Sequence, residues 1–140
     1  IVTFLCDRYP EFRLAPAAND TDRGVFLQWL FFFSSSLQTA YQMTYHTDRF
    51  CESTVDHDSV QHRSGRRLHE LWQVVDNAIG NREWMLGQKF SAADIYLFML
   101  TTWLSDEHGH PVVEEFPNVS RVANAVLSRP AVQKIYQPLS

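Results

Sequence analysis

Phe90-Ser91-Ala92-Ala93-Asp94-Ile95 is the stretch of sequence that decides the fold. Ser91, placed just before a helix, can accept a hydrogen bond from the backbone N–H of Asp94, and the Asp94 carboxylate can accept one from the N–H of Ser91. Phe90 and Ile95 flank this pair at the positions of a hydrophobic staple. The carboxylate also suits the positive end of the helix dipole. The stretch therefore predicts a capped helix start, and capping explains Asp94 better than a role as acid or base does.

The helix that follows is predicted to lie at the centre of the domain. Residues 95–104 are apolar nearly all round apart from Thr101 and Thr102, as expected of a helix packed on every side. Gly109 and Pro111 end the pattern.

A long helix is predicted upstream of this centre. Asp20 or Thr21 offers an oxygen to cap it, and no breaker follows before Asp48. Its apolar residues keep a helical period, so we expect them to face the core. They are Phe26, Trp29, Leu30, Phe33, Leu37, Ala40 and Tyr41.

Two further apolar stripes and a short last helix complete the pattern. Asp56 or Asp58 can cap the first of these helices, and Gly80 ends it. Ser128 and Pro130 start the last helix, which runs through Ile135 and Tyr136. No sustained alternation with a period of two is present, so we expect an all-α fold without a sheet. The stripes are Leu68, Leu71, Trp72, Val75, Ala78 and Ile79, and then Val119, Val122, Ala123, Val126 and Leu127.

The first residues are predicted to close a helix that begins upstream. Apolar residues fall at helical spacing in residues 1–9, and Pro10 follows. The chain also opens on Ile1 within this amphipathic pattern, which we interpret as the edge of a fragment. Residues 10–21 have the composition of a linker.

Composition limits the classes of partner. A chain of 140 residues that is 45% hydrophobic suits one domain with a real core. A net charge of -4 gives no field for a polyanion, so we expect no nucleic-acid and no membrane partner. The longest apolar stretch, residues 25–33, is too short to span a bilayer. Cys6 and Cys51 form no secreted disulfide pattern, which favours a cytoplasmic location.

No complete active site is visible in the sequence. Arg63, Arg66 and Arg67 share a helix face, where a solvated surface is a better explanation than an anion site. The aromatic and polar side chains most able to line a pocket are equally well explained by core packing, and both interpretations stay open. The nearest histidine pairs lack a third ligand, so we expect no metal. These pairs are His57 with His62 and His108 with His110, and the pocket candidates are Phe31, Phe32, Gln38, Tyr41, Tyr45 and Trp103.

Five motifs in this order resemble the C-terminal half of glutathione transferases, with beta-like bacterial members as the most similar group. The resemblance covers essentially the whole chain and implies a glutathione-transferase C-terminal helical bundle of about five helices plus the tail of a preceding helix. The motifs are residues 1–10 as the end of a thioredoxin-like domain, Leu14-Ala15-Pro16 as the linker, Gln28-Trp29-Leu30 in the first helix, residues 86–95 around the capped helix start, and residues 128–132 in the terminal helix.

The resemblance implies two domains and a function for the whole protein. Residues 1–16 would be the tail of the thioredoxin-like domain and the linker, and residues 17–140 the glutathione S-transferase C-terminal domain. The whole protein would be a cytoplasmic homodimer that conjugates glutathione, its co-substrate, to hydrophobic electrophiles. The family's thiol-activating groups lie upstream, so no catalytic residue is expected here. A non-catalytic protein-interaction or assembly domain is the alternative that the resemblance leaves open.

In this family the helical domain supplies the pocket for the electrophile. Phe31 would face the partner subunit's glutathione, while Tyr41 and Trp103 would border an exposed apolar patch. Beta-like members often carry a histidine and a basic residue where Gln38 and Thr39 stand, and this departure puts that polar assistance to the thiolate in doubt. The substrate-binding residues implied by position are Phe31, Gln38, Thr39, Tyr41, Tyr96 and Trp103.

Overall fold

The computed structural model describes residues 1–136. These residues form an all-α structure, as the sequence predicts, in which extended pairing is limited to isolated bridges between residues 84 and 89. Short 3₁₀ helices lie in the connections, including Pro10–Phe12 within the expected linker and Asp106–His108 after the central helix. The α-helices are α1 Val2–Arg8, α2 Arg23–Phe32, α3 Gln38–Tyr45, α4 His57–Ile79, α5 Ala92–Thr101, α6 Pro117–Leu127 and α7 Pro130–Tyr136.

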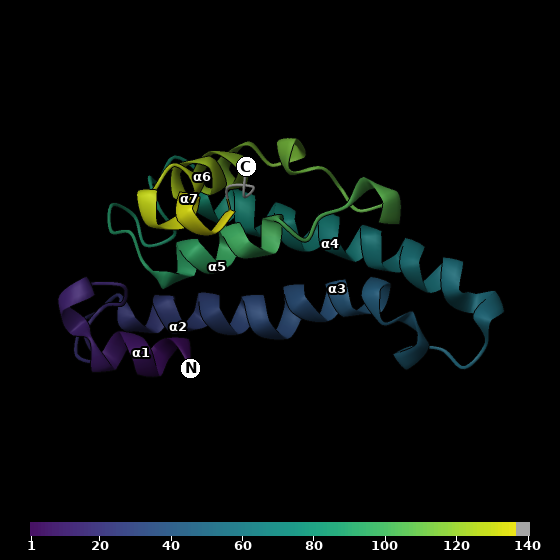
Figure 1. Cartoon of the computed structure of the whole chain (residues 1–140), viewed down its shortest axis with the longest axis horizontal. Helices are drawn as coiled ribbons and strands as arrows, with labels where there is room; N and C mark the ends of the chain where they lie inside the picture. The colour runs from purple at the N-terminus through teal and green to yellow at the C-terminus, as the bar shows by residue number, and fades with distance from the viewer. Residues whose placement is uncertain (137–140) are drawn as a thin grey trace.

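Helices α2 and α3 form one long rod, joined by a π-helical segment at Phe33–Leu37 (Figure 1). Helix α4 packs along α3, and α5 contacts both α2 and α6. Helix α1 lies beside α2 at one end of the rod (Figure 1). The observed order therefore matches the predicted bundle of five helices, with α2–α3 counted as one helix and the short helix α1 before it.

The core is formed by the predicted stripes. Every member of the stripe on the long rod is buried, and so are Leu68, Leu71, Trp72, Val75 and Ile79 of α4. One prediction on α6 is wrong, because Leu127 is 39% exposed. It lies at the edge of the stripe that the other four residues define, since one further residue turns a helix by about 100°. The core therefore involves α2 to α6 together.

The predicted capping box is present at α5. The N–H of Ser91 donates to Asp94 Oδ2 over 2.8 Å, the Ser91 side chain accepts from the backbone of Asp94 in return, and Ser91 Oγ also accepts from the N–H of Ala93 over 3.2 Å. Asp94 Oδ1 also accepts from the N–H of Met85 over 2.7 Å. The carboxylate thus fixes both the helix start and the loop before it.

The ring of Phe90 has other partners than the expected staple. It lies 5.0 Å from the ring of Trp84, and the Arg129 guanidinium carbon lies 3.8 Å from its centre. These contacts join the loop before α5 to the start of α7. A contact between Phe90 and Ile95 stays a prediction.

Two predicted caps are wrong. Helix α2 begins at Arg23 after Asp22, and no side chain caps it; the Asp20 carboxylate instead accepts from the N–H of Asp22 over 2.9 Å. Asp56 precedes α4 but makes no capping hydrogen bond. A 3₁₀ helix, Thr54–Asp56, runs directly into α4, so the capping hydroxyl is that of Ser53, one turn earlier. A cap acts where the chain first turns, which here comes before the α-helix itself.

Candidate functional site

The candidate site is a cavity of about 430 Å³ on the α3 side of the bundle. Its walls come from α3 and from the residues that end α5. The π-helical segment directly precedes α3, and such segments recur beside functional sites. The cavity is lined by Gln38, Tyr41, Gln42, Tyr45, His46, Thr102 and Trp103.

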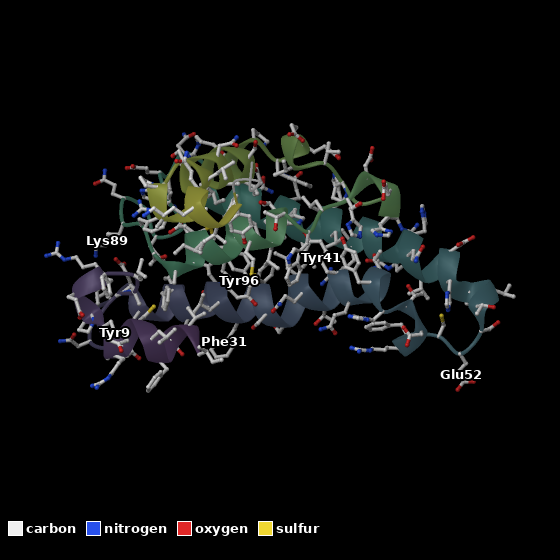
Figure 2. All side chains as sticks on the ribbon, viewed as in Figure 1. Tyr9, Phe31, Tyr41, Glu52, Lys89 and Tyr96 are labelled. Carbon is white, nitrogen blue, oxygen red and sulfur yellow. The ribbon has the colours of Figure 1, made fainter. Side chains whose placement is uncertain are left out.

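Tyr41 forms the floor of this cavity and belongs to the core. It is 1% exposed, its hydroxyl donates to the Leu100 carbonyl over 2.7 Å, and Trp72 Nε1 donates to that hydroxyl over 3.2 Å. Burial raises the pKa of Tyr41, so the phenol stays protonated. Figure 2 shows Tyr41 between the α2–α3 rod and the helices above it. The expectation that Tyr41 borders an exposed apolar patch is therefore wrong, because the whole side chain is buried in the core.

Tyr45 and Trp103 form the aromatic wall. The Tyr45 hydroxyl donates to the Trp103 carbonyl over 2.7 Å, and the Trp103 ring meets the Tyr41 ring edge-on at 5.6 Å. Partial burial raises the pKa of Tyr45. The wall thus offers flat apolar surface on which the Tyr45 hydroxyl and the Trp103 carbonyl are already paired with each other.

Gln38 and Tyr96 form a polar pair at the side of the cavity that faces α5. The Tyr96 hydroxyl donates to Gln38 Oε1. Burial raises the pKa of Tyr96, which keeps this phenol protonated as a donor. Because the Gln38 oxygen accepts, its amide nitrogen is oriented as a donor.

Gln38 and Tyr96 also line a second, more apolar hollow of about 680 Å³ between α1, α5 and α7. Its other residues are almost all apolar, including Val2 and Leu5 of α1, Met99 of α5 and Ile135 of α7. A third hollow, of about 910 Å³, lies along the linker beside Lys89. The Gln38–Tyr96 pair thus separates the aromatic cavity from the apolar groove.

The structure brings together four of the six predicted substrate-binding residues. Gln38, Tyr41 and Trp103 line the aromatic cavity, and Tyr96 is bonded to Gln38. Phe31 is 67% exposed and points away from the bundle (Figure 2). Thr39 is also exposed, and its hydroxyl donates to the Ser35 carbonyl over 2.8 Å.

Three residues of the cavity were missed from the sequence. Gln42 and His46 follow Gln38 at intervals of four residues, so the helical period of α3 would have found them. Thr102 follows the end of α5. Its position could not be predicted, because it depends on how α5 packs against α3.

The arginine cluster is an ordinary ion-paired surface, and the histidines do not gather into a metal site in the described residues. Arg63 and Arg67 both donate to Glu70, over 3.3 and 3.0 Å, as on an ordinary solvated face. Within the described part of the chain, no group of three or more histidine, cysteine or acidic side chains is arranged to hold a metal ion. No helix among residues 1–136 is long and apolar enough to cross a membrane.

Comparison with known proteins identifies relatives. The family model "Glutathione S-transferase, C-terminal domain" matches residues 26–130. Glutathione S-transferase GstA of Escherichia coli O157:H7 is 27% identical over 103 residues, which are 74% of this chain and 48% of that protein. The glutathione S-transferase-like protein tpcF of Aspergillus fumigatus is 26% identical over 96% of this chain and 64% of its own length. The chain thus spans about half to two thirds of these two relatives.

Solved structures show the same fold. BphK, described as a bacterial GST in a ternary complex, superposes with a TM-score of 0.79 at 26% identity, over 94% of this chain and 62% of its own. A sphingomonad glutathione S-transferase complexed with glutathione gives a TM-score of 0.80 at 24% identity, over 95% and 62%. A beta-class enzyme of Sphingomonas chungbukensis gives 0.77 at 22% identity, over 95% and 62%.

Proposed function

The chain belongs to the family of glutathione S-transferase C-terminal domains, and from that premise we propose that it shapes the electrophile pocket of a glutathione transferase. In this proposal residues 1–16 close a thioredoxin-like domain and its linker, and residues 17–140 are the helical domain; the last four residues lie outside the described chain. The whole protein is a cytoplasmic homodimer that conjugates glutathione to hydrophobic electrophiles.

The aromatic cavity beside α3 is the observation that carries this proposal. Its wall of Tyr45 and Trp103 suits a flat apolar ring, because aromatic surfaces stack well and their hydroxyl and carbonyl groups are already paired. The amides of Gln38 and Gln42 can donate to an acceptor on that ring. A pocket with apolar walls and a few polar groups is the usual form of a small-molecule site.

The chemistry assigned to the whole protein is thiolate addition. The glutathione sulfur attacks the electrophilic carbon as a thiolate, an S–C bond forms, and with an aryl halide the halide leaves with its bonding electron pair. Donors that lower the thiol pKa are therefore required. Neither cysteine of this chain is suited to replace glutathione, because Cys6 has a pKa raised by burial and Cys51 donates to the Thr47 carbonyl. We assign the activating donors to a thioredoxin-like domain.

The homodimer is supported by the outer surface of α2. Phe31 is 67% exposed and Val25 is 41% exposed, on a helix whose opposite face is core. An exposed phenylalanine on this face is available for contact with a second protein. In the proposed dimer Phe31 contacts the partner subunit.

A non-catalytic assembly domain is the second candidate. Thr39, which stands where beta-like relatives often carry a basic residue, is exposed and bonded to its own helix. This departure favours a domain that keeps the fold without assisting the thiolate.

Kinetics on the longer protein that carries this chain decide between the two. With glutathione and 1-chloro-2,4-dinitrobenzene, Trp103→Ala is expected to raise KM for the dinitrobenzene several-fold while KM for glutathione is unchanged. Val74→Ala, at a residue that is 51% exposed on α4, is the matched control. Turnover no faster than the uncatalysed reaction would contradict the transferase and favour the assembly domain.

A further inference from the structure

A chain of hydrogen bonds crosses the bundle behind the aromatic cavity. His110 is 4% exposed, and its Nε2 lies 3.0 Å from Thr44 Oγ1 of α3. Thr44 donates to Ser64 Oγ of α4 over 2.7 Å, and Ser64 donates to the Ala40 carbonyl over 2.7 Å. The chain thus ties the segment 105–110 to two helices.

The direction of this chain fixes the form of the imidazole. A hydroxyl has one proton, and those of Ser64 and Thr44 are both donated onward, so Thr44 can only accept from Nε2. On the other side of the ring, Nδ1 accepts from the N–H of Ser105 over 3.3 Å. Both contacts require a neutral His110 with its proton on Nε2.

The segment also lies directly on α4. A Cβ atom at Gly65 would come within 2.4 Å of the Gly109 carbonyl oxygen, so only glycine allows this approach. Gly109 itself has a φ of +67°, which favours glycine. The 105–110 segment is therefore seated by close backbone contact as well as by His110.

This segment is continuous with the cavity wall. The His110 ring lies 5.6 Å from the ring of Tyr41 and 5.8 Å from that of Tyr45, which form the floor and the wall. Trp103, whose carbonyl accepts from Tyr45, stands two residues before Ser105. Movement of the segment would therefore move the wall.

We propose that His110 is a positioning residue whose neutral form holds the Tyr45–Trp103 wall, and that proton uptake at Nδ1 releases the 105–110 segment and weakens binding of an aromatic ligand. The part of this inference that concerns ligand binding rests on the proposed function. The part that concerns the segment does not.

The surroundings of His110 disfavour the charged ring. Its neighbours from α3 and α4 are the uncharged Tyr41, Tyr45, Thr44 and Ser64, and within its own segment the ring of His108 lies 5.8 Å away. The acidic residues of that segment, Asp106 and Glu107, are exposed. Burial, followed by the charge of His108, lowers the pKa of His110, and these two causes outweigh a hydrogen bond with the Trp103 backbone that raises it. A proton added at Nδ1 would also point at the N–H of Ser105, which now donates to Nδ1, so this hydrogen bond would be lost.

The sign of the pH effect follows. In the folded protein the pKa of His110 lies below the ordinary value of about 6.5. The stability that neutral His110 contributes is therefore fully present at a pH above about 6.5. As the pH falls below it, the unfolded chain takes up a proton that the folded chain resists, and stability falls.

Nitrogen NMR on this chain, labelled at its histidines, tests whether neutral His110 holds the 105–110 segment. We expect His110 in the Nε2–H tautomer, with a pKa below the ordinary histidine value of about 6.5 and a Ser105 amide shift that follows its titration. A proton on Nδ1, or a His110 titration to which the Ser105 amide does not respond, would overturn the proposal. This spectrum is decisive even if no variant of His110 folds.

Binding of 1,3-dinitrobenzene, an uncharged probe that quenches tryptophan, tests the effect on the wall. As the pH is lowered from 7.5 through the His110 titration that the NMR experiment locates, the Kd of the probe is expected to rise several-fold. His110→Gln should abolish this dependence, because the glutamine amide can donate to Thr44 without titrating, whereas His108→Gln should keep it. The same pH dependence in His110→Gln overturns the positioning role. Absence of binding at every pH contradicts the proposed pocket. The NMR titration then still decides whether His110 holds the 105–110 segment.

Discussion

At the scale of single residues, Asp94 has more partners than a cap requires. Its carboxylate accepts from the N–H groups of Met85 and Ser91 and from the Ser91 hydroxyl. Local spacing predicts the Ser91 contacts, because they lie within one turn. The contact with Met85 depends on how the 84–90 loop folds back, which the period of the sequence does not encode.

Substitution of the capping pair should therefore be asymmetric. Ser91→Ala is expected to lower the free energy of unfolding by about 0.5–2 kcal/mol. Asp94→Ala should cost more, because it also leaves the N–H of Met85 without its partner, at about 1–3 kcal/mol for a buried group. The double variant should lose less than the sum. Urea unfolding measures all three, and an Asp94→Ala variant of unchanged stability would refute the capping account.

Tyr41 shows where family position and structure differ. Tyr41→Phe keeps the ring but leaves Trp72 Nε1 without its partner, while the Leu100 carbonyl still accepts from the N–H of Trp103, so we expect a loss of about 1–3 kcal/mol. A thermal melt beside a KM measurement on the longer protein checks this. An unchanged melting temperature with a raised KM would show that Tyr41 acts through ligand binding and not through stability.

At the scale of elements, the rod formed by α2, the π-helical segment and α3 has one core face and one outer face. Trp29 is 8% exposed and packs against the rings of Phe32 and Phe33. Trp29→Ala should cost about 3–5 kcal/mol. Phe31→Ala, at a ring that is 67% exposed on the same helix, should change stability by about 0.5 kcal/mol or less. Equal losses in the two variants, measured by denaturant unfolding, would contradict this assignment of faces.

Helix positions and core faces could be predicted from the sequence, because they follow from a local period. Contacts between elements could not. Asp76 of α4 accepts from the N–H groups of Asn118 and Val119 at the start of α6, more than 40 residues away in the chain. His110 likewise acts through Thr44 of α3. Four cavity residues, Gln38, Tyr41, Tyr45 and Trp103, were already pocket candidates from the sequence pattern, although core packing explained them equally well. Thr102 required the packing of α5 against α3.

At the scale of the whole molecule, apolar surface remains exposed on both terminal helices. Phe4 of α1 is 67% exposed and Ile135 of α7 is 78% exposed, beside the apolar groove between these helices. Surface of this kind favours association. We expect the weight-average mass of this chain to rise with concentration in sedimentation experiments. A monomer at every concentration tested would contradict this expectation.

The central claim is that the helical domain itself binds the electrophile in the cavity beside α3. Amide chemical-shift mapping of this chain with 1,3-dinitrobenzene at neutral pH tests it most directly. The account predicts shifts centred on Gln38, Gln42, Tyr45 and Trp103, with none at Val74 on the outer face of α4. Shifts confined to the groove between α1 and α7, or no saturable shift at all, would contradict it.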